Sequence, residues 1–133
     1  MDEIKPRHLY TIISDDVREE LGNKLSFIGV YDKSIFVPKL PARLAKLCFS
    51  HYWTGGQGKF KVVGKLVSPS GQVVADITIE EVRLDEKTSE RHVLIFQFSG
   101  LVFNEPGKHR LQTYFGSSDI PDRVDEIEIK LSE

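Results

Sequence analysis

The four histidines are the residues of this chain best suited to metal binding or proton transfer. None of them shows the His-x-His or His-Glu-x-x-His spacing with which one segment supplies two metal ligands. Ser99, which precedes Gly100, lacks the two framing glycines of a nucleophile elbow. The sequence therefore predicts no catalytic residue, no metal ligand and no cofactor. The histidines are His8, His51, His92 and His109.

Two groups of aspartates lie in or near segments expected to be turns. Carboxylate oxygens are the ligands that Ca²⁺ prefers, and the loop tips of a β-sandwich are places where such ligands gather. Aspartate is also a preferred turn residue for its own hydrogen bonding, and no EF-hand spacing is present. No calcium site is therefore predicted. The groups are Asp15, Asp16 and Asp32, and Asp119, Asp122 and Asp125.

An aromatic cluster at the end of a predicted strand is the main candidate for partner or ligand binding. His51, Tyr52 and Trp53 run into a glycine-rich loop that contains Gln57. Tyrosine and tryptophan rings stack on sugars and anchor protein interfaces. In the alternative interpretation Trp53 points into the core while Tyr52 faces the other way. Burial of Trp53 would remove the sugar-binding interpretation.

Charge and composition limit the function classes. The formal net charge of −2 does not provide the broad positive field that supplies most affinity for nucleic acids. Lys59, Lys61 and Lys65 share one face of a predicted strand, where they are expected to be solvated rather than to bind oligonucleotides. Apolar runs of about four residues are far shorter than the roughly 20 needed to cross a bilayer. Neither a nucleic acid nor a membrane is expected as a partner.

The chain of 133 residues is expected to fold as one domain, residues 1–133, in the cytoplasm. Its N-terminal residues are acidic where a signal peptide would be basic, and no apolar segment follows them. The single cysteine, Cys48, is flanked by Leu47 and Phe49, so it is predicted to pack as a small buried hydrophobe. His51 is expected on the opposite face of the same strand.

Period-two alternation predicts strands. In Lys59–Val67 the apolar residues Phe60, Val62 and Leu66 alternate with lysines, and after the turn at Ser68–Gly71 the pattern resumes through Ile79, which predicts a hairpin. Beyond Ile79 the apolar residues expected to point inward are Val82 and Leu84, so the alternation shifts by one position. A β-bulge at Glu80-Glu81 is expected to absorb the extra residue.

The remaining strands are predicted from similar patterns. Leu9–Leu21 and Lys24–Tyr31 flank Gly22-Asn23 and favour a hairpin with a two-residue turn, the alternative being a helical turn over 16–21. A short helical turn is expected at Pro41–Lys46. The segment His92–Phe98, apolar on both faces, predicts a central strand. The other predicted strands are Ser34–Val37, Lys46–Trp53, His109–Phe115 and Val124–Leu131, the last with Ile127, Ile129 and Leu131 inward.

Eight or nine strands joined by Gly, Pro, Asn and Ser turns predict an all-β protein. A two-sheet antiparallel β-sandwich is favoured over a barrel, because most strands alternate cleanly. The Cys, Trp, Cys spacing of antibody domains is absent, which leaves an immunoglobulin-like or C2-like topology.

The first third of the chain resembles a known family. Asp15-Asp16-Val17-Arg18, then Lys24-Leu25-Ser26-Phe27-Ile28-Gly29-Val30-Tyr31, and then Val37-Pro38 with Leu40-Pro41 follow the pattern of a family of small bacterial proteins known only as a domain of unknown function. One departure is Asn23, which stands between Gly22 and Lys24. The resemblance implies an immunoglobulin-like β-sandwich and no assigned activity, so it transfers no catalytic residue.

These observations favour a non-catalytic β-sandwich that binds a protein partner or itself, through a sheet edge or the loops around His51–Gly58. The first alternative is a carbohydrate-binding or small-ligand-binding module that uses Tyr52 and Trp53. A hydrolase whose site is assembled from dispersed residues is a third hypothesis, because sequence spacing does not test it.

Overall fold

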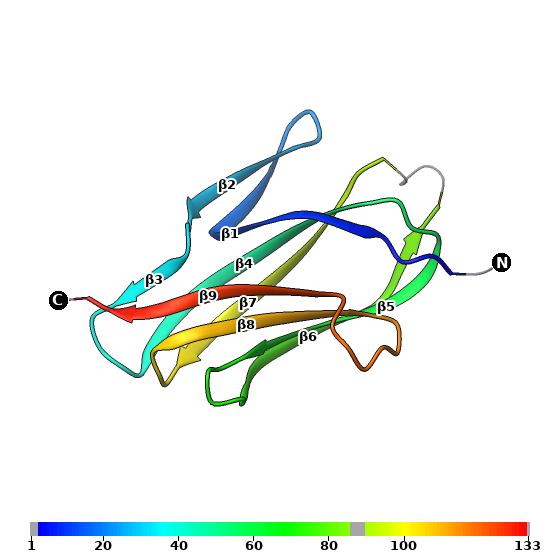
Figure 1. Ribbon diagram of the computed structural model, residues 1–133. Coiled ribbons are helices and arrows are strands. Elements are labelled where there is room, and N and C mark those ends of the chain that lie inside the picture. Colours follow the sequence, from blue (N-terminus) through cyan, green and yellow to red (C-terminus); the bar gives the residue numbers. More distant parts are fainter. Residues whose placement is uncertain (1–2, 86–89, 133) are drawn as a thin grey trace.

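The computed structural model describes residues 3–85 and 90–132, and within these ranges it contains nine strands and no helix (Figure 1). The strands are β1 (Arg7–Glu20), β2 (Lys24–Val30), β3 (Ser34–Val37), β4 (Ala42–Thr54), β5 (Gly58–Val67), β6 (Val73–Leu84), β7 (His92–Phe103), β8 (Gly107–Phe115) and β9 (Arg123–Leu131).

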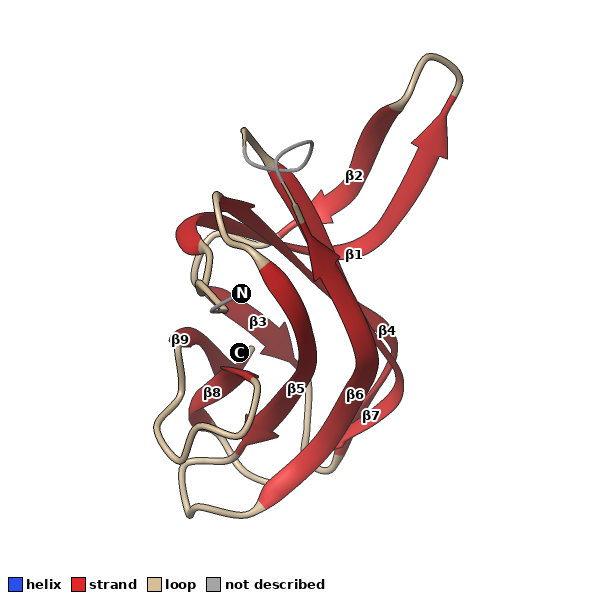
Figure 2. Ribbon diagram, turned by 90° about the vertical axis from the view of Figure 1, so that its right-hand side faces the viewer, coloured by secondary structure: helices blue, strands red, loops and turns tan. Residues whose placement is uncertain are grey.

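The strands form two sheets, with the orders β2-β1-β4-β7 and β3-β9-β8-β5-β6 (Figure 2). Neighbouring strands are antiparallel except β3 and β9, which pair in parallel. The apolar core lies between the sheets and draws on both of them. The predicted two-sheet β-sandwich is therefore confirmed.

Alternation places the core as the sequence predicts. On β5 the side chains of Phe60, Val62 and Leu66 are buried, while the lysines between them are exposed. The predicted bulge is also present, because Phe60 pairs with Val82 but Val62 pairs with Ile79. Two residues of β6, Glu80 and Glu81, thus lie opposite one residue of β5. On β9, Ile127 and Ile129 are buried, but Leu131 at the strand end is 52% exposed, so its predicted inward position is wrong.

The predicted central position of His92–Phe98 is wrong. This segment belongs to β7, which pairs only with β4 and forms one edge of its sheet. The central strand is β4, where both faces are fully buried from Leu47 to His51. The outward residues Val93 and Ile95 are only half-buried, so apolar residues on both faces of this segment did not require a central strand.

Two turn predictions also need correction. The segment 41–46 is not helical, because β4 begins at Ala42, which pairs with Phe103 of β7. At the first hairpin the strands end at Glu20 and Lys24, so the connection holds three residues rather than two. Its Gly22 and Asn23 have φ values of 85° and 57°, and glycine and asparagine are the residues that tolerate this region. The alternative helical turn over 16–21 is not formed.

The first hairpin leaves the sheet as an arm, defined here as residues 16–28. Pairing between β1 and β4 ends at Ser14, whereas pairing between β1 and β2 continues to Glu20. Beyond Ser14 the arm therefore consists of two strands, and Figure 2 shows it standing away from the body of the sandwich. Leu21 in its loop is 94% exposed.

The base of the arm covers the outer face of β4. Cys48 and Ser50 point away from the core but are fully buried, and the backbone amide of Val17 hydrogen-bonds the Cys48 thiol. The carboxylate of Asp16 accepts a hydrogen bond of 3.0 Å from Lys46 of β4, which lowers the pKa of Asp16. The predicted burial of Cys48 is confirmed, and an outer layer from the arm is the reason.

The rate of thiol labelling at Cys48 is expected to report how tightly the arm packs. Burial raises the pKa of this thiol, so it should react slowly until the arm opens. Phe27 lies half-buried on the same face of the arm as its partner Val17. Phe27→Ala should accelerate labelling about tenfold, which corresponds to about 1.4 kcal/mol of opening free energy.

The matched control is Ile28→Ala, on the opposite, more exposed face of the arm. Its labelling rate with an aromatic disulfide reagent should stay close to that of the wild type. Equal acceleration by both substitutions would show that the arm does not protect Cys48 through this face.

Candidate functional site

The structure separates the four residues of the predicted aromatic site. His51 and Trp53 point into the core and are 0% and 1% exposed, whereas Tyr52 between them faces outward. Gln57 lies in an isolated bridge with Ile4, held by two backbone hydrogen bonds of 2.8 Å. The buried indole of Trp53 offers no face to a sugar, which removes the sugar-binding interpretation.

Tyr52 belongs to an aromatic group on the outer face of the sheet. Its ring stacks on that of Tyr10 with centroids 4.7 Å apart, and the guanidinium of Arg91 lies over both rings and hydrogen-bonds the Tyr10 hydroxyl. A groove of about 500 Å³ separates this face from the arm, and its lining includes Leu25, Tyr52 and Val93.

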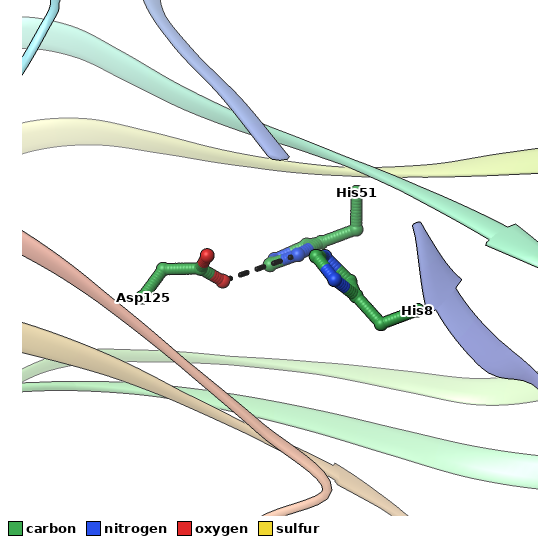
Figure 3. A group of neighbouring side chains, drawn as sticks. All are labelled: His8, His51 and Asp125. Carbon is green, nitrogen blue, oxygen red and sulfur yellow. Dashed lines mark ion pairs between the residues drawn. The ribbon is translucent and has the colours of Figure 1, made fainter. Parts of the chain in front are cut away.

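His51 instead belongs to a cluster between the two sheets. His8 of β1, His51 of β4 and Asp125 of β9 place one potential ligand atom each within 4.8 Å of one another. Figure 3 shows the Asp125 carboxylate directed at the His51 ring, with the His8 ring beside it. The cluster thus joins side chains from both sheets.

Short contacts fix the geometry of this cluster. The Thr11 hydroxyl lies 2.7 Å from Nε2 of His8 and 3.0 Å from Nδ1 of His51, so it can donate to one nitrogen and accept from the other. Oδ2 of Asp125 lies 3.4 Å from the same Nδ1 of His51. Arg123 donates two hydrogen bonds, of 3.1 and 3.0 Å, to the other carboxylate oxygen of Asp125.

The electrostatics keep His51 neutral. Burial lowers its pKa to about 4, and the nearby Asp125 carboxylate only partly opposes that effect. Burial also lowers the pKa of His8. Two buried atoms of the cluster, Nε2 of His51 and Oδ2 of Asp125, have no hydrogen-bond partner. Polar atoms this deeply buried are normally paired, so these two call for an explanation.

The cluster does not have the geometry of a Ser-His-Asp relay. Such a relay needs the carboxylate at one ring nitrogen and the nucleophile at the other. Here the Thr11 hydroxyl and the Asp125 carboxylate approach the same nitrogen, Nδ1 of His51. His51 and Asp125 therefore do not form such a relay with Thr11. The ligand atoms of His8, His51 and Asp125 are instead of the types that bind a metal ion.

The sequence interpretation missed this cluster because its members come from distant segments. A local signal existed for two of them. His51 lies two positions from Phe49 and from Trp53, and Asp125 lies two positions before Ile127, so each shares a strand face with apolar residues. Period-two alternation therefore pointed both side chains inward. Which inward residues meet was decided by the pairing of β1 with β4 and by the stacking of the two sheets.

Three of the other aspartates considered as calcium ligands have separate roles. Asp15 accepts a hydrogen bond from the Tyr31 hydroxyl, and Asp16 binds Lys46. Asp122 accepts hydrogen bonds from Lys5 and from the backbone of Phe115. Their carboxylates support loops and strand ends, and only Asp125 joins the cluster.

The fold and the cluster together define a class, a two-sheet β-sandwich with a buried, mixed histidine and carboxylate centre. The chain belongs to the Family of unknown function (DUF6941), which matches residues 9–120. No curated protein matches it. In the described part of the chain there is no helix of the length and apolarity required to span a membrane.

Two solved structures share a distant likeness in fold. One is the Pseudomonas fluorescens alkylpurine DNA glycosylase AlkC bound to DNA containing an abasic site analog, with 14% identity, a TM-score of 0.42, and coverage of 73% of this chain and 27% of the other. The second is a beta-glucosidase from Listeria innocua in complex with glucose, with 15% identity, a TM-score of 0.42, and coverage of 94% and 16%. The chain spans less than a third of either protein, and this degree of likeness indicates no shared activity.

Proposed function

We propose that this protein is a non-catalytic interaction module of the cytoplasm that associates with a second copy of itself through β2. The observation that carries the proposal is the unpaired outer edge of β2 in the arm. In the sheet order β2 is the outermost strand, and its regular part runs from Lys24 to Ile28, where the positive φ of 67° at Gly29 interrupts it.

The composition of this edge favours pairing. Natural sheet edges usually carry charges, bulges or proline that prevent association. The edge strand β6 of the other sheet follows that rule, with the Glu80-Glu81 bulge and several charges. Strand β2 has the sequence Lys-Leu-Ser-Phe-Ile-Gly-Val and thus one charge. An isolated pair of strands is also marginally stable, so the arm gains from further strands.

A two-fold axis through Ser26 gives a complementary register. Antiparallel pairing of two β2 strands about this residue places Leu25 opposite Phe27 of the partner, and Lys24 opposite Ile28. The apolar pair adds cross-strand packing, and no like charges meet. Such isologous pairing joins two four-stranded sheets into one continuous sheet.

The effect of a charge introduced at Ile28 on dimer formation should depend on its sign. Ile28→Lys would set two lysines directly opposite each other twice in the dimer, and should raise the dimer dissociation constant at least tenfold. Ile28→Glu would set a carboxylate opposite Lys24 and should leave the dimer substantially intact. Sedimentation equilibrium over a range of concentrations measures both.

A control tests the general effect of an added lysine. Val73, at the start of edge strand β6, is 55% exposed, and Ile28 is 41% exposed. Val73→Lys should therefore leave association unchanged. A wild-type protein that remains monomeric well above micromolar concentration, or equal effects of lysine at both positions, would overturn the proposal.

Two further features are consistent with this function. The unpaired thiol of Cys48 suits a reducing compartment such as the cytoplasm. The ring nitrogen shared by Thr11 and Asp125 argues against hydrolase chemistry at His51. An immunoglobulin-like strand topology remains part of the proposal, as a rigid scaffold that presents an arm or loops is the usual way such sandwiches bind proteins.

A further inference from the structure

We propose that His8, His51 and Asp125 bind a Zn²⁺ ion between the two sheets. Two imidazole nitrogens and one carboxylate oxygen form a ligand set found in zinc sites that have three protein ligands and one open position. All three side chains project from strands, which hold ligands more precisely than loops do. The site is independent of the arm and of its association.

The spacing of two ligand atoms matches tetrahedral zinc. Zn–N and Zn–O bonds of roughly 2.0–2.2 Å at a tetrahedral angle put neighbouring ligand atoms about 3.4 Å apart, whereas an octahedral angle would put them about 3.0 Å apart. Nδ1 of His51 and Oδ2 of Asp125 are 3.4 Å apart. They are outside good hydrogen-bond geometry, and Oδ2 has no hydrogen-bond partner. A cation between them would give Oδ2 the partner that it lacks.

His8 can complete the set with a small movement. The three ligand atoms lie within 4.8 Å of one another, so the widest separation exceeds a tetrahedral edge by roughly 1.4 Å at most. His8 is the partly exposed member of the cluster and lies on β1 beside a register shift between His8 and Tyr10. Rotation of its side chain brings Nε2 toward the ion.

Neighbouring groups would orient the ligands. Arg123 occupies Oδ1 of Asp125 with two hydrogen bonds, which leaves Oδ2 as a single ligand atom. The Arg123 hydrogen bonds to the ligand Asp125 are of the kind that normally raises the affinity of a site for its metal. Thr11 lies at hydrogen-bond distance from the same two nitrogens that would bind the ion, so its hydroxyl gives up these contacts when the ion binds.

The charge and the connectivity of the site favour binding. Zinc binds the unprotonated nitrogen of an imidazole ring. Asp125 supplies the negative charge in a site where the side chain of His51 is fully buried. Because the ligands come from both sheets, bound zinc would link the sheets and stabilise the folded state.

The test uses the full chain without a polyhistidine tag, freed of metal with a chelator and then titrated with ZnCl₂. Calorimetry should show one ion per chain. At a free Zn²⁺ concentration a hundredfold above Kd, Tm should rise by roughly 5–10 °C. Co²⁺ in place of Zn²⁺ should give the intense visible absorption of a four-coordinate site.

Two variants and a control locate the ion. His8→Ala should weaken zinc binding at least tenfold and abolish the Co²⁺ absorption, and its partial exposure makes folding of this variant the expected result. Asp125→Asn tests the carboxylate. His92→Ala, at a half-buried histidine outside the cluster, should bind zinc like the wild type. No Tm shift with zinc, or equal affinity in wild type and His8→Ala, would overturn the proposal.

Discussion

Phe96→Ala is expected to lower the free energy of unfolding by about 3–5 kcal/mol, the range found for removal of a large buried ring. Phe96 of β7 is fully buried, and its ring meets the His51 ring edge-on with centroids 5.2 Å apart. Across the core the ring also lies against Gly64 of β5. Loss of this side chain would open a cavity between the two sheets.

Urea unfolding followed by the fluorescence of Trp53 provides the measurement. Phe36→Ala is the matched control, because Phe36 of β3 is 64% exposed and its removal should change stability by less than about 0.5 kcal/mol. Comparable losses in the free energy of unfolding for the two variants would show that the apolar core does not lie between the two sheets.

Gly64→Ala is expected to destabilise the protein by about 1–3 kcal/mol through overpacking. A Cβ atom at this position would lie 2.8 Å from Cε2 and 3.0 Å from Cδ2 of Phe96. The ring is fully buried and packed, so it cannot yield by moving into solvent. Glycine is required here because a ring from one sheet approaches the backbone of the other.

A double-mutant cycle separates overpacking from loss of backbone flexibility. In a Phe96→Leu background the smaller side chain should accept the new methyl group, so Gly64→Ala should cost markedly less there than in the wild type. Residues in contact are expected to show such non-additivity. An unchanged cost in both backgrounds would place the effect in the backbone of β5 instead.

The two proposed functions use different parts of the molecule. Association depends on the edge of β2 in the arm, whereas zinc binding depends on the cluster between β1, β4 and β9. Ile28→Lys is therefore expected to leave zinc binding intact, and His8→Ala to leave association intact. Together these variants would show whether zinc binding stabilises the sandwich and whether the arm forms the dimer contacts independently of zinc.

Local patterns in the sequence determined most strands and the inward face of each. The alternation of β5, the bulge of β6 and the positive φ values of Gly22 and Asn23 follow from residues near each other in the chain. Such patterns predict the face to which each side chain points, because successive side chains of a strand point to opposite faces. The burial of Cys48 was predicted from its apolar neighbours Leu47 and Phe49, whereas the arm that covers it was not predicted.

Only the tertiary structure decided which strands became neighbours. The sequence of β7 shows apolar residues on both faces but does not show which strands pair with its two edges, so its edge position could not be predicted. The same holds for His8, His51 and Asp125, since each lies on a different strand and the two sheets bring them together. Strand pairing and sheet stacking depend on contacts between distant segments, and periodicity within one segment carries no information about them.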